Sequence, residues 1–212
     1  MANFHHLRNE FQLYQLDEAT LVSNPLDLFE HWLEEAITSG EPEPTAMILA
    51  TADLEGSPSA RVVLLKEVSA EGFDFFTNYS SRKGIEIGAS GKASLVFFWP
   101  LTQRQVRVEG EVARVSAEKS DQYFMERPEG SRISAVASPQ SREISSRHDL
   151  EMMYFDAASH PDNLSRRPDY WGGYMVKPKR IEFWQGRENR LHDRIVFTAG
   201  GVEEWSISRL AP

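Results

Sequence analysis

The segment "NRLHDR", residues 189–194, places Arg190, His192 and Arg194 at alternate positions. Alternate side chains of a β-strand point to one face, so a strand here would line up two guanidinium groups around an imidazole. Histidine exchanges protons near neutral pH, and positive charge beside it attracts an anion. The segment predicts a site for an anionic molecule, although surface strands also carry charged rows.

Two further segments place cations where an anionic ligand would suit them. In "SARVVLLK", Arg61 and Lys66 bracket four aliphatic residues, and on a regular strand they would face opposite sides. In "TNYSSRKG", a serine at 80–81 can cap a short helix with Arg82 and Lys83 in its first turn. Cations there oppose the helix dipole unless an anion, such as a phosphate, binds at the same end. A buried strand with charged ends and a solvated turn are the plainer alternatives.

The segment "RQVRVEG" alternates between apolar and polar residues. Val106 and Val108 are expected to face the core, with Gln105, Arg107 and Glu109 on the opposite face. A glutamine side chain offers both a hydrogen-bond donor and a hydrogen-bond acceptor. A bound ring that carries both carbonyl and N–H groups on its edge requires both. An exposed strand face is the alternative.

The segment "YFMERPEGSR" gathers polar side chains near the end of a predicted helix and in the loop expected after it. They are Tyr123, Arg127, Ser131 and Arg132. Arginine near a helix C-terminus is also ordinary dipole matching. Taken together, the cation-bearing segments suit a phosphorylated cofactor and a phosphorylated substrate.

Composition excludes several classes of protein. The 212-residue chain carries 32 acidic and 23 basic residues, a formal charge of −9, which disfavours nucleic acid and anionic membranes as partners. It has no cysteine, so disulfides and thiolate metal sites are excluded, and its histidines show no metal-ligand spacing. No apolar run approaches the roughly 20 residues of a membrane span. A soluble cytoplasmic protein is expected.

The chain must position these groups on a mixture of helices and short strands. Residues 23–40 are predicted as a helix capped by Ser23 or Asn24, with Pro25 in its first turn and Gly40 after its end. Strands are expected over 46–53, 59–68, 73–78, 92–99 and 104–115, and again within 171–212, with turns at 185–189 and 198–201. Helices are expected over 117–127 and 146–158. The pattern predicts an antiparallel barrel or sandwich in one domain, 23–212, after a flexible arm, 1–22.

These motifs, in this order, resemble the pyridoxine (pyridoxamine) 5′-phosphate oxidase family. The resemblance rests on "SARVVLLK", "FFTNYSSRKG", "RQVRVEG", "YFMERP", "SPQS", "WGGY", "IEFWQGRENRLHDR" and the terminal "RLAP". It implies an α+β fold, an antiparallel split β-barrel with flanking helices, that binds FMN at a homodimer interface. Two departures are Phe76, where relatives often have Tyr, and "RNEF" at 8–11, which resembles an Arg-x-Glu-Tyr segment with Phe11 in place of the aromatic hydroxyl.

The resemblance also implies residue roles. The residues implied for the cofactor are Arg61, Val62, Val63, Leu64, Leu65, Lys66, Phe76, Thr77, Arg82, Lys83, Gln105, Gln140, Ser141, Trp184 and Arg194. Of these, Gln140, Ser141, Trp184 and Arg194 are expected from the partner subunit. The substrate phosphate would be held by Lys66, Tyr123, Arg127 and Ser131, while Arg190 and His192 would lie against the pyridine ring as catalytic groups.

The implied reaction oxidises pyridoxamine 5′-phosphate or pyridoxine 5′-phosphate to pyridoxal 5′-phosphate, with dioxygen as acceptor and hydrogen peroxide released. The preferred substrate stays open, as does the choice for His192 between proton transfer and orientation. One alternative is a related flavin oxidase acting on another ring, of the phenazine-precursor type. Another is a non-catalytic split-barrel protein that binds flavin or haem.

Overall fold

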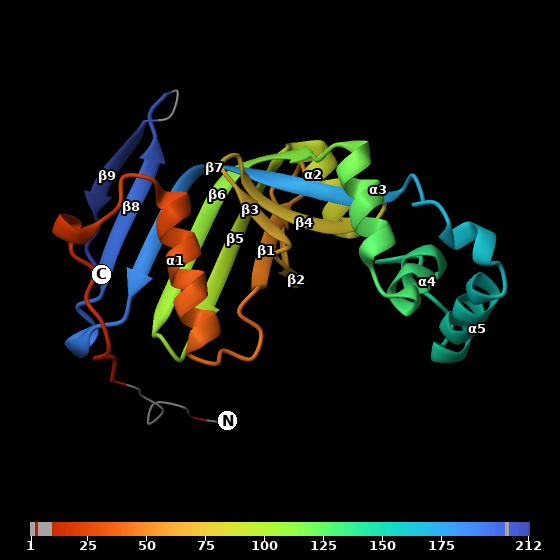
Figure 1. Ribbon diagram of the computed structural model, residues 1–212, viewed down its shortest axis with the longest axis horizontal. Coiled ribbons are helices and arrows are strands. Elements are labelled where there is room, and N and C mark those ends of the chain that lie inside the picture. Colours follow the sequence, from red (N-terminus) through yellow and green to blue (C-terminus); the bar gives the residue numbers. More distant parts are fainter. Residues whose placement is uncertain (1–2, 4–9, 202–203) are drawn as a thin grey trace.

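Helix α1 (Pro25–Thr38) fills the concave side of a curled antiparallel sheet (Figure 1). The computed structural model describes residues 3, 10–201 and 204–212. The helix begins as predicted, because the Asn24 side chain accepts the Leu26 N–H at 3.0 Å and Pro25 occupies the first turn. Gly40, at φ +85°, lets the chain turn away after the helix ends.

In the described part of the chain the sheet has nine strands, and the predicted strand regions are confirmed except that 59–68 divides into two strands. The strands are β1 (Ala46–Ala52), β2 (Pro58–Leu64), β3 (Glu67–Ser69), β4 (Gly72–Asn78), β5 (Lys92–Trp99), β6 (Arg104–Arg114), β7 (Trp171–Gln185), β8 (Asp193–Ala199) and β9 (Trp205–Arg209). The order is β2-β1-β5-β6-β7-β4-β3, and β8 pairs with β7 and β9. All pairings are antiparallel, in accord with the predicted fold class.

The remaining helices are α2 (Arg82–Ser90), α3 (Ala117–Glu126), α4 (Glu129–Ala137) and α5 (Arg147–Ala158), and short 3-10 turns lie at Glu18–Thr20 (η1), Pro161–Leu164 (η2) and Glu188–Arg190 (η3). Of these helices, α2 and α3 lie against the end of the sheet away from β8 and β9, and α4 and α5 project beyond it (Figure 1). Helices α3 and α5 confirm the predicted ones. The prediction that Ser131 and Arg132 lie in a loop after α3 is wrong, because both residues lie within α4. No helix among the described residues combines the length and apolarity needed to cross a bilayer.

The core is aromatic and lies between α1 and the inner face of the sheet. Phe29 is fully buried, and its ring centroid lies 4.9 Å from Phe73, 4.8 Å from Phe97 and 5.9 Å from Trp99. These rings come from α1, β4 and β5, so one side chain ties the helix to strands that lie apart in the sheet. Edge-to-face contacts of this kind add to the free energy of burial.

We expect Phe29→Ala to lower the free energy of unfolding by about 3–5 kcal/mol, because the truncated side chain leaves a cavity among aromatic rings. Urea denaturation at a fixed protein concentration measures this loss. Ile37→Ala is the matched control on the same helix, since the Ile37 side chain is 54% exposed. The control should change stability by no more than about 0.5 kcal/mol. Equal losses in the two variants would contradict the central role of Phe29.

Candidate active site

A cavity of about 530 Å³ opens where the curl of the sheet brings β2 and β4 together. Its lining comes from β2, β4, α2, α3, α4 and the segments around them. The lining residues that the sequence singled out are Arg61, Val62, Val63, Leu64, Lys66, Phe76, Thr77, Lys83, Tyr123, Arg127, Ser131 and Gln140. Cavities of this size hold small-molecule ligands and cofactors. Twelve predicted side chains from distant segments therefore share one space.

Lys66 reaches this cavity because the predicted strand ends early. β2 stops at Leu64, the chain turns, and β3 begins at Glu67. The expectation that Arg61 and Lys66 face opposite sides is wrong for this reason: both line the cavity. The Lys66 ammonium has no ion-pair partner among the described residues. Leu65, by contrast, points into the core and is 4% exposed.

Lys83 presents a buried ammonium to the cavity. Ser81 caps α2, as predicted, by accepting the Gly84 N–H, and this turn buries Lys83 to 8% exposure. Its Nζ lies 3.3 Å from the Thr77 hydroxyl and 3.0 Å from Gln140 Oε1, and no carboxylate pairs with it in the described part of the chain. Burial and then the charge of Arg61 lower the pKa of Lys83. A buried cation with only neutral partners calls for an anion.

Arg61 and Arg82 are already neutralised in part by Glu86 of α2. The Glu86 carboxylate is buried, lies 2.8 Å from Arg82 Nε and 3.5 Å from Arg61 Nη2, and accepts from the hydroxyls of Thr51 and Ser59. Burial alone would raise the pKa of Glu86, but these hydrogen bonds lower it to about 2. Glu86 therefore stays ionised and holds the two arginines in place. The sequence drew no attention to it, because an acid within a helix is common.

Helices α3 and α4 supply the opposite wall. The ring of Tyr123 stacks on Phe76 at 4.0 Å between centroids, and the Arg127 guanidinium lies 4.7 Å from the ring centre of Trp171. Arg127 Nη1 is buried without a hydrogen-bond partner, and Ser131 lies one turn into α4. Burial lowers the pKa of Arg127 and raises that of Tyr123. Trp171 lines the cavity although only its motif, "WGGY", was noticed.

Gln140 belongs to the same chain's cavity, where it accepts hydrogen bonds from Lys83 and Thr77. Within one chain Gln140 thus already contacts the cavity, and the expectation that it reaches a site from the partner subunit stays a prediction. Ser141 follows it in the left-handed region, at φ +69°, and is exposed. The alternation of apolar and polar residues does not predict the turn that holds these two residues.

Three other predicted cofactor residues form one row on the outer face of the sheet. Gln105 of β6, Trp184 of β7 and Arg194 of β8 are directly opposite one another. Arg107 and Glu109 share this face, as predicted, while Val106 and Val108 are fully buried on the other side. Arg194 pairs with the buried carboxylate of Glu182 at 2.8 Å. None of the three side chains in the row lines the cavity.

The same outer face exposes large apolar side chains. Val62 of β2, Ile48 of β1 and Phe98 of β5 are 66%, 42% and 55% exposed. Val62 is opposite Ile48, and Phe98 is opposite Gln105, so the apolar residues continue into the polar row. A contiguous apolar face of this kind marks a surface that another molecule covers.

The segment 189–194 is not the strand that the sequence predicted. Asn189 and Arg190 have φ of +55° and +62°, and β8 begins only at Asp193. Because the chain turns here, the side chains of Arg190, His192 and Arg194 do not form one strand row. The Arg187 N–H donates to His192 Nδ1 at 3.1 Å, so the neutral ring carries its proton on Nε2. Burial and then the charge of Arg190 lower the pKa of His192.

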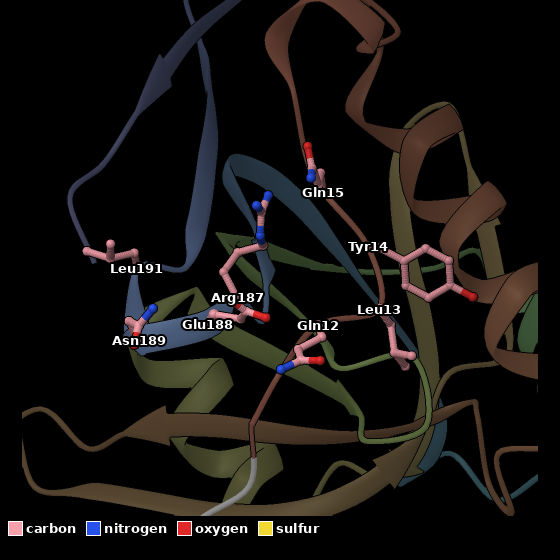
Figure 2. Close-up of a pocket in the computed structure, with 8 residues that line it drawn as sticks. All are labelled: Gln12, Leu13, Tyr14, Gln15, Arg187, Glu188, Asn189 and Leu191. Atoms are coloured by element: carbon pink, nitrogen blue, oxygen red, sulfur yellow. The ribbon is translucent and has the colours of Figure 1, made fainter.

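A second cavity, of about 680 Å³, lies between this turn and the described part of the arm (Figure 2). Figure 2 shows Gln12 to Gln15 on one side and Arg187, Glu188, Asn189 and Leu191 on the other. Arg187 already pairs with Asp193 at 3.0 Å. Phe11 packs against Trp184 and His192, with centroid separations of 5.8 and 5.9 Å. Arg8 lies outside the described residues.

The site residues thus form two groups within one chain. The first lines the cavity with three cations, Lys66, Lys83 and Arg127, that have no carboxylate partner in the described ranges, beside stacked aromatic rings. The second, on the β7–β8 hairpin, joins a neutral imidazole to arginines. The first group can bind phosphates and orient a ring, and the second can donate hydrogen bonds. The groups share no cavity, so a single chain does not bring them together.

Comparison with known proteins gives matches over most of the chain. Residues 33–158 match the family described as Pyridoxamine 5′-phosphate oxidase, and residues 171–212 match the Pyridoxine 5′-phosphate oxidase C-terminal dimerisation region. A pyridoxine/pyridoxamine 5′-phosphate oxidase of Cupriavidus necator is 48% identical over 212 residues, covering all of both chains. One from Bordetella pertussis is 47% identical and covers 97% of this chain and 98% of that protein.

Solved structures share the fold. PhzG from Burkholderia lata 383, in complex with tetrahydrophenazine-1-carboxylic acid, has a TM-score of 0.87 at 28% identity and covers 96% of this chain and 100% of its own. A pyridoxamine 5′-phosphate oxidase-related, FMN binding protein from Nostoc punctiforme has a TM-score of 0.72 at 18% identity, covering 91% and 100%. These are split-barrel flavin-binding folds, which confirms the predicted architecture. The matched dimerisation region indicates a homodimer. The chain belongs to the pyridoxine/pyridoxamine 5′-phosphate oxidase family, a family of oxidoreductases.

Proposed function

We propose that the protein is an FMN-dependent oxidase that converts pyridoxamine 5′-phosphate or pyridoxine 5′-phosphate to pyridoxal 5′-phosphate. The observation that carries this proposal is the set of three cations, Lys66, Lys83 and Arg127, that face one cavity without a carboxylate partner among the described residues. Family membership supports the same reaction. A cytoplasmic location stays a prediction from the sequence, as does the division into an arm and one domain.

The cavity's chemistry fits FMN. Its phosphate would bind Lys83 with Arg61 and Arg82, and the net charge of these groups with Glu86 is about +2, which matches a phosphate dianion. Thr77 and Gln140 would give up their bonds to Lys83 or share them. The backbone of residues 61–66 and the side chain of Phe76 would lie along the ring system, and Gln105 would contact the ring from the outer face of the sheet. Ser141, Trp184 and Arg194 complete the proposed cofactor set.

The substrate phosphate would bind at a separate set of side chains, Lys66, Tyr123, Arg127 and Ser131. Arg127 supports this most directly, since its buried Nη1 has no hydrogen-bond partner. A phosphate oxygen would satisfy that donor and compensate the burial of the guanidinium. Binding energy from this remote group would hold the reacting carbon in place.

A second copy of the chain would complete each site. Arg190 and His192 are the proposed groups at the pyridine ring, yet neither lines the cavity of its own chain. They lie in the region that matches the dimerisation family, and the outer face beside it exposes Val62 and Phe98. Covering that face with a partner would bury the apolar side chains and bring the hairpin of one chain to the cavity of the other.

The reaction removes two electrons and two protons from the C4′ group of the substrate. Pyridoxine 5′-phosphate and O2 give the aldehyde and H2O2, and pyridoxamine 5′-phosphate uses one water in addition and releases ammonia. Bound flavin supplies the two-electron chemistry. Arg190 would hold the ring face and stabilise negative charge that develops on it. His192, neutral with its proton on Nε2, would donate a hydrogen bond to the substrate and orient it.

A phenazine-type oxidase is the second candidate, because PhzG shares the fold at 28% identity. Two observations favour the phosphorylated pyridine as substrate. The identity to pyridoxine/pyridoxamine 5′-phosphate oxidases is greater, at 48%, and Lys66 and Arg127 offer a separate site for a substrate phosphate. Competition between the two ring systems for the purified protein distinguishes the candidates.

We expect the protein purified with FMN to be yellow and dimeric and to form pyridoxal 5′-phosphate and peroxide in equal amounts from pyridoxine 5′-phosphate. Absorbance of the aldehyde and a coupled peroxidase assay measure the two products. Turnover of a dihydrophenazine carboxylate in preference to the phosphorylated pyridine would favour the second candidate. A colourless protein that takes up no FMN would contradict both.

Arg127→Ala should raise KM for pyridoxine 5′-phosphate by roughly tenfold or more, because a charge-assisted hydrogen bond worth about 1.5–3 kcal/mol is lost. Steady-state kinetics measure the change, and kcat should fall less than KM rises. Arg166→Ala is the control, since Arg166 forms an exposed pair with Asp169. An unchanged KM would remove Arg127 from the phosphate site.

Arg190→Met should lower kcat by about 10- to 100-fold while FMN stays bound, because a group that stabilises developing charge is removed. Rapid-mixing reduction of the flavin by substrate measures the chemical step, and flavin fluorescence reports FMN binding. Glu188→Gln changes an exposed charge in the same turn and should leave kcat within about twofold. Normal turnover in Arg190→Met would exclude the proposed role.

A further inference from the structure

The position of α3 decides whether the proposed phosphate site can form. Tyr123 lies in this helix and Arg127 caps its end, whereas Lys66, the other cation of the site, lies in the β2–β3 connection. Residues 119, 123 and 127 are four apart, so they follow one face of the helix. Any group that fixes this face against the sheet also fixes the distance between the two halves of the site.

Lys119 makes such a contact in the first turn of α3. Its Nζ lies 2.5 Å from Asp74 Oδ2 on β4 and 2.8 Å from Glu67 Oε1 on β3. The Asp74 side chain is 1% exposed, and Lys119 is its one polar partner among the described residues. Burial raises the pKa of Asp74, and the ammonium opposes that rise. The ion pair with Lys119 therefore compensates the burial of this carboxylate.

Asp74 contacts the other half of the site through its main chain. Its carbonyl oxygen accepts the Lys66 N–H at 2.9 Å. Two residues further along β4, Phe76 stacks on Tyr123 at 4.0 Å. Asp74 therefore touches the Lys66 segment with its backbone and α3 with its carboxylate.

We propose that Asp74 and Lys119 are positioning residues that set the separation of Lys66 from Tyr123 and Arg127, and so the affinity for the phosphate of the substrate. This inference rests on the proposed function. Neither side chain lines the cavity, so neither touches the substrate. The pair acts by holding the helix, and its loss would let the first turn of α3 move away from β4.

A second lysine that pairs with the β3–β4 hairpin offers a matched comparison. Lys177 of β7 pairs with Glu71 at 3.1 Å, but these side chains are 49% and 67% exposed and neither belongs to α3. An exposed pair of this kind contributes little to stability. Lys177→Met therefore removes a charge and an ion pair near the hairpin without releasing α3.

The test compares Lys119→Met, Asp74→Asn, the double variant, Lys119→Arg and Lys177→Met, each loaded with FMN. Asp74→Asn keeps the carbonyl that binds Lys66, so it probes the side chain alone. We expect Lys119→Met and Asp74→Asn to raise KM for pyridoxine 5′-phosphate by roughly three- to tenfold, with kcat within about twofold. The double variant should raise KM by no more than either single variant does, since the pair acts as a unit. Lys119→Arg should restore KM, and Lys177→Met should not change it.

Binding of product with and without its phosphate separates positioning from general destabilisation. The dissociation constants of pyridoxal 5′-phosphate and pyridoxal are measured by the change in flavin fluorescence. We expect Lys119→Met to weaken the binding of pyridoxal 5′-phosphate and to leave the binding of pyridoxal unchanged. Equal weakening of both ligands, or a KM equal to that of the unaltered protein, would overturn the inference. Failure of the unaltered protein to oxidise pyridoxine 5′-phosphate would instead overturn the proposed function.

Discussion

A buried ammonium without a counter-charge is the constraint on which the site depends. Lys83 is 8% exposed and bonds only to neutral oxygens in the described chain. Burying a charge is costly unless an opposite charge joins it, so this position favours the binding of an anion. The cap at Ser81 turns the chain so that Lys83 points inward. Glu86, one turn later, neutralises the neighbouring arginines and leaves Lys83 free for a ligand.

The aromatic core joins α1 to the sheet that forms the cavity. Phe29 joins rings from β4 and β5, and the sheet curls around α1 until β2 and β4 face one cavity. The outer face of the same sheet behaves differently. There Arg194 and its neighbours Arg107 and Arg180 already share the carboxylate of Glu182. On the outer face each of these arginines pairs with a carboxylate, whereas Lys66, Lys83 and Arg127 of the cavity pair with none among the described residues.

The two groups of site residues differ in whether one chain can bring them to the cavity. The cavity is assembled by contacts within one copy, from the stacking of Tyr123 on Phe76 to the ion pair of Lys119 with Asp74. The β7–β8 hairpin lies outside that cavity and belongs to a region that matches a dimerisation family. The proposed reaction would therefore require the dimer, since the imidazole of His192 and the cavity would meet only across two copies.

Sequence alone determined the ends of α1, the cap of α2 and the alternation along β6, because Asn24, Ser81 and Val106 act through local geometry that neighbouring residues dictate. It also identified the cations of the site by type. Tertiary structure alone decided which of them share a space. Lys66 joins Arg61 only because β2 ends early, and Arg190 leaves its expected row because φ turns positive at +62°. Period-two alternation assumes a continuous strand, and a break in the strand depends on contacts from distant segments.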